Sequence, residues 1–444
     1  NGHECVNARN SAITEEGYLV AARYLRQLKP DILMGAVAPG WSFRPEEITL
    51  AQILAKAGYR CAHFGKWHLG PVKAASPTSP GAMGFHEWLS HDNFFEMNPS
   101  LSRNGGPPEV IKGEGSEVVI AEAIRFIDRA KQDGKPFFTV VWFGSPHEPY
   151  SGLPEDLALY DDLPAKYSTK KVKLTSNETG GPVTRPQGDV LRERYAEITA
   201  MDRAIGTLRK HLTAQSLRDN TLLFYCGDNG TSGDGSLGSP HRGVKGAVYD
   251  GGTLVPGLIE WPARIPQPRN TTVRATTTDL LPTLCAITGQ SLPARPIDGI
   301  DLTPVLDGKI TARPKPLYFW EFTAGPRKGK AEPYIELELQ KGTTPLAKLA
   351  GGKATRDFTN SRHPTISDTD YVGPRAIIDG NLKLVIHDGK KGEPKRELFD
   401  LKSDLAEKTN VIEQQPATAE KLQTALRDWQ QGVLQSLTGA DYAK

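Results

Sequence analysis

The chain has 444 residues, of which 38% are hydrophobic and 24% are charged, the composition of an ordinary globular protein. Its formal net charge is +2, so the bulk charge points neither to nucleic acid nor to a membrane surface as a partner. No apolar run is long enough to span a bilayer, and the 4 cysteines show neither paired nor metal-type spacing. The length predicts two or three domains with ample material for a large core.

The first part of the chain alternates helix, strand and polar loop. A helix pattern covers residues 14–28, and a second helix begins after Thr49, which has Gln52 three residues on as the partner of a capping box. A β-prone run at 59–64 follows and ends in the polar motif GKWHLG at 65–70. This succession is typical of an α/β fold.

The next part repeats that succession. Residues 71–115 are rich in Gly, Pro, Ser and Asn, which predicts a long surface excursion at the mouth of a site. A helix capped by Ser116 follows, and then comes FFTVVWF at 137–143, the most apolar run of the chain. That strand ends in GSPHEP at 144–149, and after another irregular stretch a long amphipathic helix covers about residues 189–212.

The most informative stretch is 220–245. An apolar run at 222–226 predicts a buried parallel strand, and it ends in the turn that carries Asp228 and Asn229. These two side chains offer the hard oxygen ligands that Ca²⁺ or Mg²⁺ prefers, although an ordinary Asp-Asn-Gly turn is the alternative. Lys245 follows a Gly-rich loop and is placed to hold an anion.

Three apolar strands therefore each end in a glycine followed by polar, titratable residues. In open α/β sheets, ligands bind beyond the carboxyl ends of the strands. The repeated pattern predicts a site assembled at one edge of a sheet.

The predicted fold class is α/β, with a mainly parallel mixed sheet sandwiched by helices and a smaller C-terminal α+β domain. Residues 1–320 are expected to form the catalytic α/β domain. Residues 321–372 have a Gly/Lys/Pro/Thr bias and are interpreted as a linker or insertion. Residues 373–444 predict a small antiparallel sheet followed by a helix that begins at Pro416.

Taken together, the motifs resemble the sulfatase family, of the arylsulfatase type and within the alkaline-phosphatase superfamily. They occur in the family's order, and the resemblance covers roughly residues 35–320 and 373–410. The motifs are GKWHLG at 65–70, PHEP at 146–149, GDNG at 227–230, KG and YDGG within 245–252, TDLLPT at 278–283 and ELFDL at 397–401.

The resemblance implies a Ca²⁺ site and a formylglycine nucleophile made from a cysteine. The residues that it assigns are Asp228 and Asn229 for Ca²⁺, Lys66 and His68 for contact with the formylglycine, and His147 and Lys245 for the sulfate oxygens and the leaving group. The chemistry agrees, because the negative charge of a sulfate ester must be neutralised as its S–O bond breaks.

The N-terminus departs from the family's pattern. The nucleophile motif best matches Cys5-Val6-Asn7-Ala8-Arg9, so Cys5 is the candidate for conversion and Arg9 its partner, with Asn7 standing where the family has Pro or Ala. The family also places two adjacent aspartates after its first strand, and nothing before Cys5 supplies them. We therefore expect that the family's N-terminal segment, with that strand and acidic pair, is missing from this chain.

The predicted function is hydrolysis of a sulfate monoester on a carbohydrate. A non-catalytic protein that binds sulfated glycans and a metal-dependent phosphoesterase are the alternatives. The expected partners are a sulfated small molecule or glycan and a formylglycine-generating enzyme that acts on Cys5, with no nucleic acid and no membrane span. The resemblance suggests a periplasmic or secreted protein.

Overall fold

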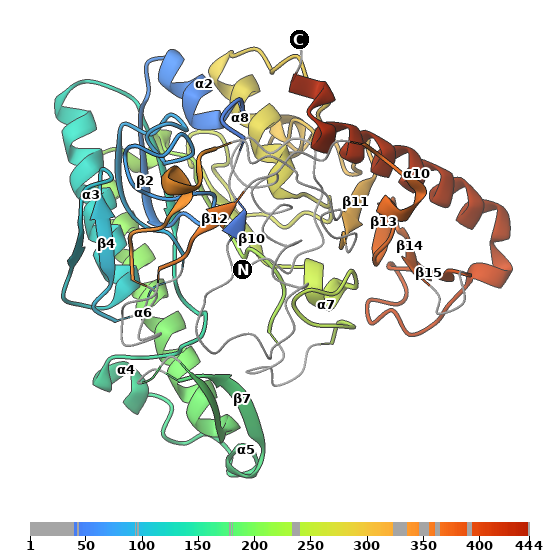
Figure 1. Ribbon diagram of the computed structural model, residues 1–444, viewed down its shortest axis with the longest axis horizontal. Helices are drawn as coiled ribbons and strands as arrows, with labels where there is room; N and C mark the ends of the chain where they lie inside the picture. The colour runs from blue at the N-terminus through green and yellow to red at the C-terminus, as the bar shows by residue number, and fades with distance from the viewer. Residues whose placement is uncertain are drawn as a thin grey trace. The chain divides into compact units, whose positions relative to one another are not determined.

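The computed structural model describes residues 40–41, 44–93, 95, 97–176, 179, 181–232, 240–322, 335–345, 355–359, 365–388 and 393–442 (Figure 1). Contacts within the chain divide it into two compact units. Of the described residues, unit 1 holds those of 220–334 and 361–444, and unit 2 holds those of 30–219 and 335–360. The helix predicted at 14–28 and the candidates Cys5 and Arg9 lie outside the described residues.

Unit 2 is built on a five-stranded mixed sheet in the order β5-β4-β3-β2-β6. Its strands are β2 (Arg60–Lys66), β3 (Glu87–His91), β4 (Ser100–Arg103), β5 (Pro108–Val110) and β6 (Phe137–Trp142). Strand β2 is parallel to both β3 and β6, so the carboxyl ends of these three strands meet at one edge of the sheet. The other pairs are antiparallel, as expected for the predicted mixed sheet.

The helices of unit 2 begin where local sequence signals place them. Helix α2 (Leu50–Lys56) has the predicted capping box, in which Thr49 accepts from the Gln52 amide at 3.1 Å and the Gln52 side chain accepts from the Thr49 amide at 3.0 Å. Helix α3 (Gly115–Gln132) is capped by Glu114 and not by the predicted Ser116, because the longer carboxylate reaches the Glu117 amide at 2.9 Å. Helix α3 packs on β2, β6 and α6 (Gln187–Ala214).

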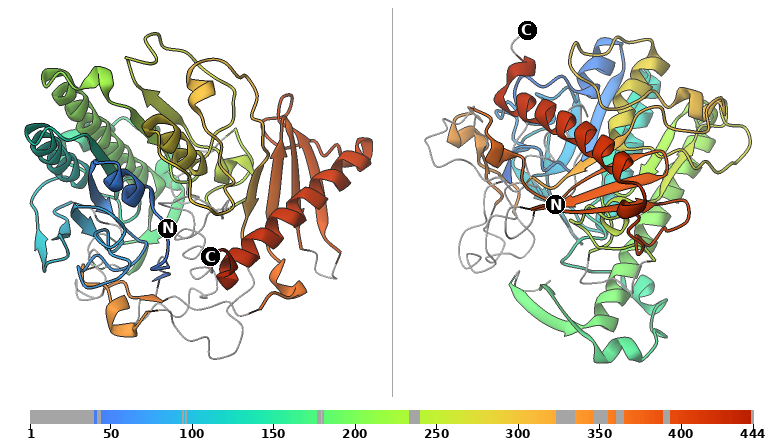
Figure 2. Two further views of the ribbon diagram at one scale, coloured as in Figure 1. Left: turned by 90° about the horizontal axis from the view of Figure 1, so that it is seen from above. Right: turned by 90° about the vertical axis from the view of Figure 1, so that its right-hand side faces the viewer.

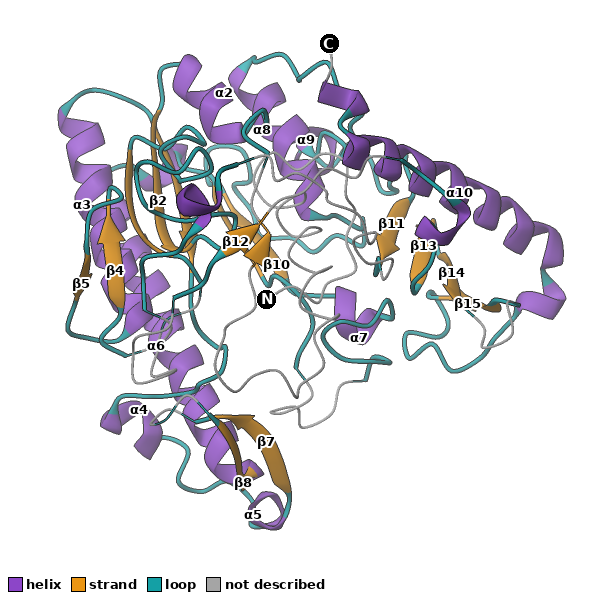
Figure 3. Cartoon of the chain, viewed as in Figure 1, coloured by secondary structure: helices purple, strands orange, loops and turns teal. Residues whose placement is uncertain are grey.

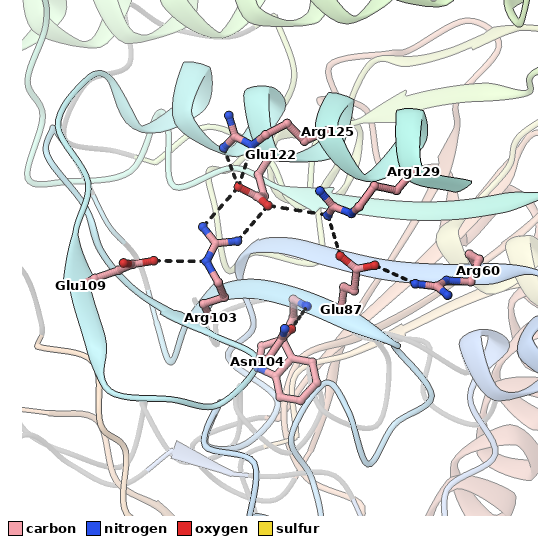
Figure 4. A network of polar contacts seen from close by, with 9 residues as sticks. Arg60, Glu87, Arg103, Asn104, Glu109, Glu122, Arg125 and Arg129 are labelled. Carbon is pink, nitrogen blue, oxygen red and sulfur yellow. Dashed lines mark hydrogen bonds and ion pairs between the residues drawn. The ribbon is translucent and has the colours of Figure 1, made fainter. Parts of the chain in front are cut away.

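An ion-pair network joins α3 to three strands of this sheet (Figure 4). The buried carboxylate of Glu122 in α3 accepts from Arg103 of β4 at 2.8 Å. Glu87 of β3 accepts from Arg129 of α3 at 2.6 Å and from Arg60 of β2 at 2.9 Å. The network therefore fixes the helix on the sheet whose edge carries the candidate residues.

The stretch 71–115 is not the surface excursion that its composition predicted. It contributes β3, β4 and β5, and it buries Trp88, Leu89 and Leu101. Its glycines serve close packing as well as turns, since a Cβ at Gly81 would lie 2.5 Å from the Trp88 ring. Composition alone did not distinguish packed short strands from an exposed loop.

Unit 1 contains two further sheets. Strands β11 (Leu317–Trp320), β13 (Arg375–Asp379), β14 (Leu382–His387) and β15 (Lys395–Asp400) form an antiparallel sheet in that order. Helix α10 (Pro416–Thr438) lies across it (Figure 2). Trp429 of that helix packs with Trp320 and Leu384 in a common core. The predicted small antiparallel sheet with a C-terminal helix is confirmed.

The prediction of a parallel strand at 222–226 is wrong. Strand β9 (Leu223–Cys226) is half-buried and, among the described residues, pairs antiparallel with β10 (Gly257–Glu260). An apolar run of this length fits a half-buried antiparallel strand as well as a buried parallel one, and the apolar pattern does not separate them. Of the three predicted strand ends, those of β2 and β6 belong to one hydrogen-bonded sheet, and no pairing among the described residues joins β9 to it.

The remaining elements are short. Strands β7 and β8 form a hairpin whose second strand packs against α6 (Figure 3). None of the helices among the described residues is long and apolar enough to cross a membrane. The other bounds are β1 (Gly40–Trp41), β7 (Lys171–Thr175), β8 (Pro182–Pro186), β12 (Phe358–Thr359), α4 (Pro154–Ala158), α5 (Lys166–Thr169), α7 (Asp250–Thr253), α8 (Leu280–Thr288) and α9 (Thr303–Leu306).

Candidate active site

Three candidate residues lie at the sheet edge of unit 2. Lys66 is the last residue of β2 and is 8% exposed, and His68 follows two residues later and is 6% exposed. His147 lies in the turn after β6, the neighbouring parallel strand. The parallel pairing of β2 and β6 thus brings the three side chains to one edge, as the sequence pattern predicted for these two strands.

His68 is held in an unusual conformation and a dry environment. Its φ of 55° lies in the left-handed region, which is uncommon for a residue other than glycine. Its ring packs edge-on to Phe358, with 6.4 Å between the ring centroids. Burial lowers the pKa of His68 well below its usual value, and the positive charges of Lys66, Arg356 and His147 act in the same direction. His68 is therefore a neutral imidazole at neutral pH.

His147 has a defined tautomer. Its Nδ1 lies 2.6 Å from the carbonyl oxygen of Glu148, which can only accept, so Nδ1 carries a proton. Nε2 is then the nitrogen that takes up or releases a proton. The Glu148 carboxylate in turn accepts from the backbone N–H of Thr175 at 2.9 Å, which fixes the turn on β7.

A third strand end at this edge was missed in the sequence. The His91 ring accepts from the Asn93 backbone N–H at 2.9 Å through Nδ1, so Nε2 donates to the Pro345 carbonyl at 2.8 Å. The Asp92 carboxylate is fully buried and accepts from Val72, Thr343 and Thr344. A signal was present, because the run Trp-Leu-Ser-His ends in Asp-Asn, as the other candidate strands end in polar residues.

Unit 1 carries the candidate metal ligands. Asp228 is exposed, and its Oδ1 accepts from the Asn229 backbone N–H at 2.9 Å. The Asn229 Nδ2 donates to the Gly230 carbonyl at 2.9 Å, whereas its buried Oδ1 has no hydrogen-bond partner among the described residues. A buried amide oxygen of this kind, next to a carboxylate, fits a hard cation such as Ca²⁺. The described residues contain no group of three or more His, Cys, Asp or Glu side chains that would hold a metal.

Lys245 lies on a loop that is joined to this turn. Its backbone N–H donates to the Thr231 carbonyl at 2.9 Å, and the Gly230 N–H donates to the Gly252 carbonyl at 2.9 Å. A Cβ at Gly230 would lie 2.0 Å from the Gly251 carbonyl oxygen, so only glycine permits this approach. The GDNG and YDGG motifs are thus two sides of one close backbone contact.

A buried ion network anchors the same loop to the C-terminal sheet. The Lys383 Nζ of β14 lies 2.6 Å from the Asp250 carboxylate and 2.8 Å from that of Glu407, and all three side chains are buried. Next to it, Tyr249 donates to Glu397 of β15 at 2.6 Å. The C-terminal sheet therefore positions the loop that carries Lys245.

The candidates thus form two groups, Lys66, His68 and His147 in unit 2 and Asp228, Asn229 and Lys245 in unit 1. A buried lysine beside two histidines, as in unit 2, fits the binding of an oxyanion ester, and a carboxylate beside a buried amide oxygen, as in unit 1, fits a hard cation that acts on such an ester.

Comparison with known proteins specifies the family. A family model described as Sulfatase matches residues 2–290. The chain is 30% identical over 266 residues to an ulvan-active sulfatase of Formosa agariphila, covering 59% of this chain and 50% of that protein. It is 30% identical over 288 residues to arylsulfatase A of Homo sapiens, covering 62% of this chain and 54% of that protein. The chain belongs to the sulfatase family.

The fold agrees with this assignment. The structure of Ps i-CgsB in complex with k-i-k-neocarrahexaose matches with a TM-score of 0.67 at 18% identity, over 97% of this chain and 86% of that one. At this identity the likeness shows the α/β fold alone. The chain spans about half the length of the curated relatives that it matches, 50% and 54% of the two named above.

Proposed function

We propose that this protein hydrolyses a sulfate monoester on a carbohydrate, with Ca²⁺ and a formylglycine made from Cys5 by a formylglycine-generating enzyme. The observation that carries the proposal is the group of Lys66, His68 and His147 at the carboxyl ends of β2 and β6. The family assignment supplies the reaction class. A sulfated glycan is favoured as the substrate because the ulvan-active relative carries a polysaccharide in its name and the Ps i-CgsB structure holds an oligosaccharide.

Three of the described residues have surroundings that support their proposed roles. Lys66 is a nearly buried cation, so its charge acts strongly on a sulfate oxygen at the sheet edge. The neutral imidazole of His68 is able to form a hydrogen bond without adding its own positive charge to those of Lys66 and Arg356. His147, with Nδ1 fixed by the Glu148 carbonyl, presents Nε2 for proton transfer to the leaving alcohol. For Lys245, in unit 1, the family resemblance assigns a role in binding a sulfate oxygen.

Two further groups complete the proposal. Asp228 and Asn229 would hold Ca²⁺, which when bound supplies positive charge against the sulfate oxygens. A formylglycine at position 5, in its hydrated form, would supply the attacking oxygen, and Arg9 would stabilise it. The family resemblance favours a periplasmic or secreted location, where sulfated polysaccharides are found.

The test is sulfate release by protein produced together with a formylglycine-generating enzyme. The mass of the peptide that contains Cys5 measures the conversion, and an aryl sulfate and a sulfated oligosaccharide measure turnover. His147→Gln and Lys245→Met should each lower kcat by at least about 100-fold. Lys309→Met is the matched control, because Lys309 is 72% exposed and its ion pair is with Asp307 on the surface.

The outcomes separate this proposal from its alternatives. Full activity in both His147→Gln and Lys245→Met would contradict the assigned roles. Tight binding of the oligosaccharide without sulfate release by fully converted protein would favour a glycan-binding protein. Faster turnover of the matching aryl phosphate would favour a phosphoesterase.

A further inference from the structure

In the part of the chain that the structure describes, Arg356 is a buried cation without an ion-pair partner. The residue is 6% exposed, and among the described residues its Nε and Nη2 have no hydrogen-bond partner. Burial lowers the pKa of its guanidinium only to about 10, so it stays charged at neutral pH. A buried charge that lacks hydrogen bonds costs free energy, and proteins retain one where a ligand completes it.

The structure holds Arg356 at the candidate sheet edge. The Asp92 carboxylate, directly after β3, accepts from the backbone N–H groups of Thr343 and Thr344 at 2.6 and 2.8 Å. A Cβ at Gly342 would lie 2.9 Å from the Asp92 carboxylate and 2.0 Å from the Arg356 carbonyl. The backbone of Arg356 therefore passes next to a segment that is fixed at the carboxyl end of β3.

Its side chain also acts on a candidate site residue. Phe358, two residues along, packs against the His68 ring, and the charge of Arg356 adds to the effect of burial in lowering the pKa of His68. Lys66 acts on His68 in the same way. Arg356 and Lys66 are therefore two cations near one imidazole. Their positive charges repel each other in the free protein and together attract anions.

Among the described residues, no ion pair joins Asp92 to Arg356. Both Asp92 oxygens accept other hydrogen bonds, Oδ1 from Val72 at 2.7 Å and Oδ2 from Thr343 and from the Thr344 amide and hydroxyl. Nε and Nη2 lie side by side on one edge of the guanidinium. This edge matches two oxygens of a carboxylate or sulfate with two parallel hydrogen bonds.

We propose that Arg356 binds a second oxyanion of the substrate, a carboxylate or sulfate group other than the transferred sulfate. The inference rests on the proposed function, in which Lys66, His68, His147 and Lys245 already serve the transferred sulfate. Arg356 comes from a separate segment, and its guanidinium adds two parallel N–H donors for one more anion. The substrate class is thereby narrowed to sulfated sugars that carry at least two negative groups, and Arg356 determines this specificity.

The experiment compares Arg356→Met with the wild type on two esters. One is an aryl sulfate with a single anionic group, and the other is a disaccharide that carries a second sulfate or a uronate. We expect kcat/KM for the disaccharide to fall by about 10- to 100-fold, the loss of a charge-assisted hydrogen-bond pair, and kcat/KM for the aryl sulfate to change by less than about 2-fold. Arg356→Lys keeps the positive charge but lacks the two parallel N–H donors, so it should recover only part of the lost kcat/KM for the disaccharide.

Two controls keep the result interpretable. Arg125→Gln, an arginine of the same unit with a 57% exposed side chain, should leave both esters unaffected. Arg356→Met should unfold at an equal or higher temperature than the wild type, because it removes an uncompensated buried charge. A lower unfolding temperature would instead assign Arg356 a structural role and overturn the proposal.

Binding separates this inference from the proposed function. In a Cys5→Ser background, calorimetry measures the affinity for the disaccharide without turnover, and Arg356→Met should weaken it by at least about 10-fold. If the wild type hydrolyses neither ester, the proposed function fails, whereas the binding result still decides on Arg356. Equal losses for both esters, or no loss of affinity, would overturn the second-anion site.

Discussion

Because the ion network of Lys383, Asp250 and Glu407 is buried, we predict a large loss of unfolding free energy when its cation is removed. Substituting Lys383→Met leaves two buried carboxylates that face each other without a cation, since Nζ lies 2.6 and 2.8 Å from them in the wild type. Removing one partner of a buried ion pair costs about 3–5 kcal/mol of unfolding free energy. Lys395→Met is the matched control on β15, because Lys395 is 66% exposed, and it should cost at most about 1 kcal/mol.

The assay is urea unfolding of both variants, followed by tryptophan fluorescence, at pH 8 and pH 5. Burial raises the pKa of Glu407 in the wild type, and loss of the Lys383 charge should raise it further. A carboxyl group whose native pKa exceeds its unfolded value loses stabilising free energy as the pH rises through the native pKa. The loss in Lys383→Met should therefore be larger at pH 8 than at pH 5. A loss below about 1 kcal/mol, or one equal to that of Lys395→Met, would refute the reasoning.

Two further predictions concern unit 2. His63 is fully buried, and burial lowers its pKa to about 3. Between about pH 3 and 6.5 the unfolded state therefore binds a proton more readily than the folded state. The free energy of unfolding should fall as the pH drops through that window, by up to roughly 5 kcal/mol. Acid unfolding of His63→Gln should lack most of this dependence, and an unchanged profile would contradict the assignment. In the α3 network, Glu122→Ala should cost about 2 kcal/mol in urea unfolding because its buried carboxylate binds Arg103 and Arg125. Glu109→Ala, which removes a 54% exposed partner of the same Arg103, should cost less than about 1 kcal/mol, and equal costs would contradict the role of burial.

Much of the fold could be predicted because its signals are local. The Thr49 capping box, the apolar strand β6 and the Pro416 helix start each depend on residues close together in the chain. Strand β3 was missed because its neighbourhood is rich in Gly and Pro, and packing against β2 is what makes it a strand. The pairing of β9 was predicted wrongly because its antiparallel partner β10 lies beyond a long loop, outside any local pattern.

In the candidate site, too, local sequence patterns predicted some residues and missed others. The strand-end motifs pointed to Lys66 and His147 because each lies within a few residues of the end of an apolar run. Lys383 reads in sequence as an ordinary strand lysine, yet it is fully buried because Asp250 lies beside it from 133 positions earlier. Arg356 was overlooked because its segment has the composition of a linker. Its significance comes from burial and from the contacts of Asp92, which no single-sequence pattern reports.

The electrostatics of unit 2 explain why His68 is neutral. Lys66 and Arg356 both act on His68, and a third full charge beside them would add repulsion around this buried side chain. Burial is the largest cause of the lowered pKa, so the fold itself keeps the imidazole uncharged and limits this repulsion. His68 then remains able to form a directed hydrogen bond, while the charge of Lys66 serves the transferred sulfate of the proposed function and the charge of Arg356 serves the proposed second anion. The left-handed backbone at His68 and the ring of Phe358 are the means by which the chain holds that neutral side chain in place.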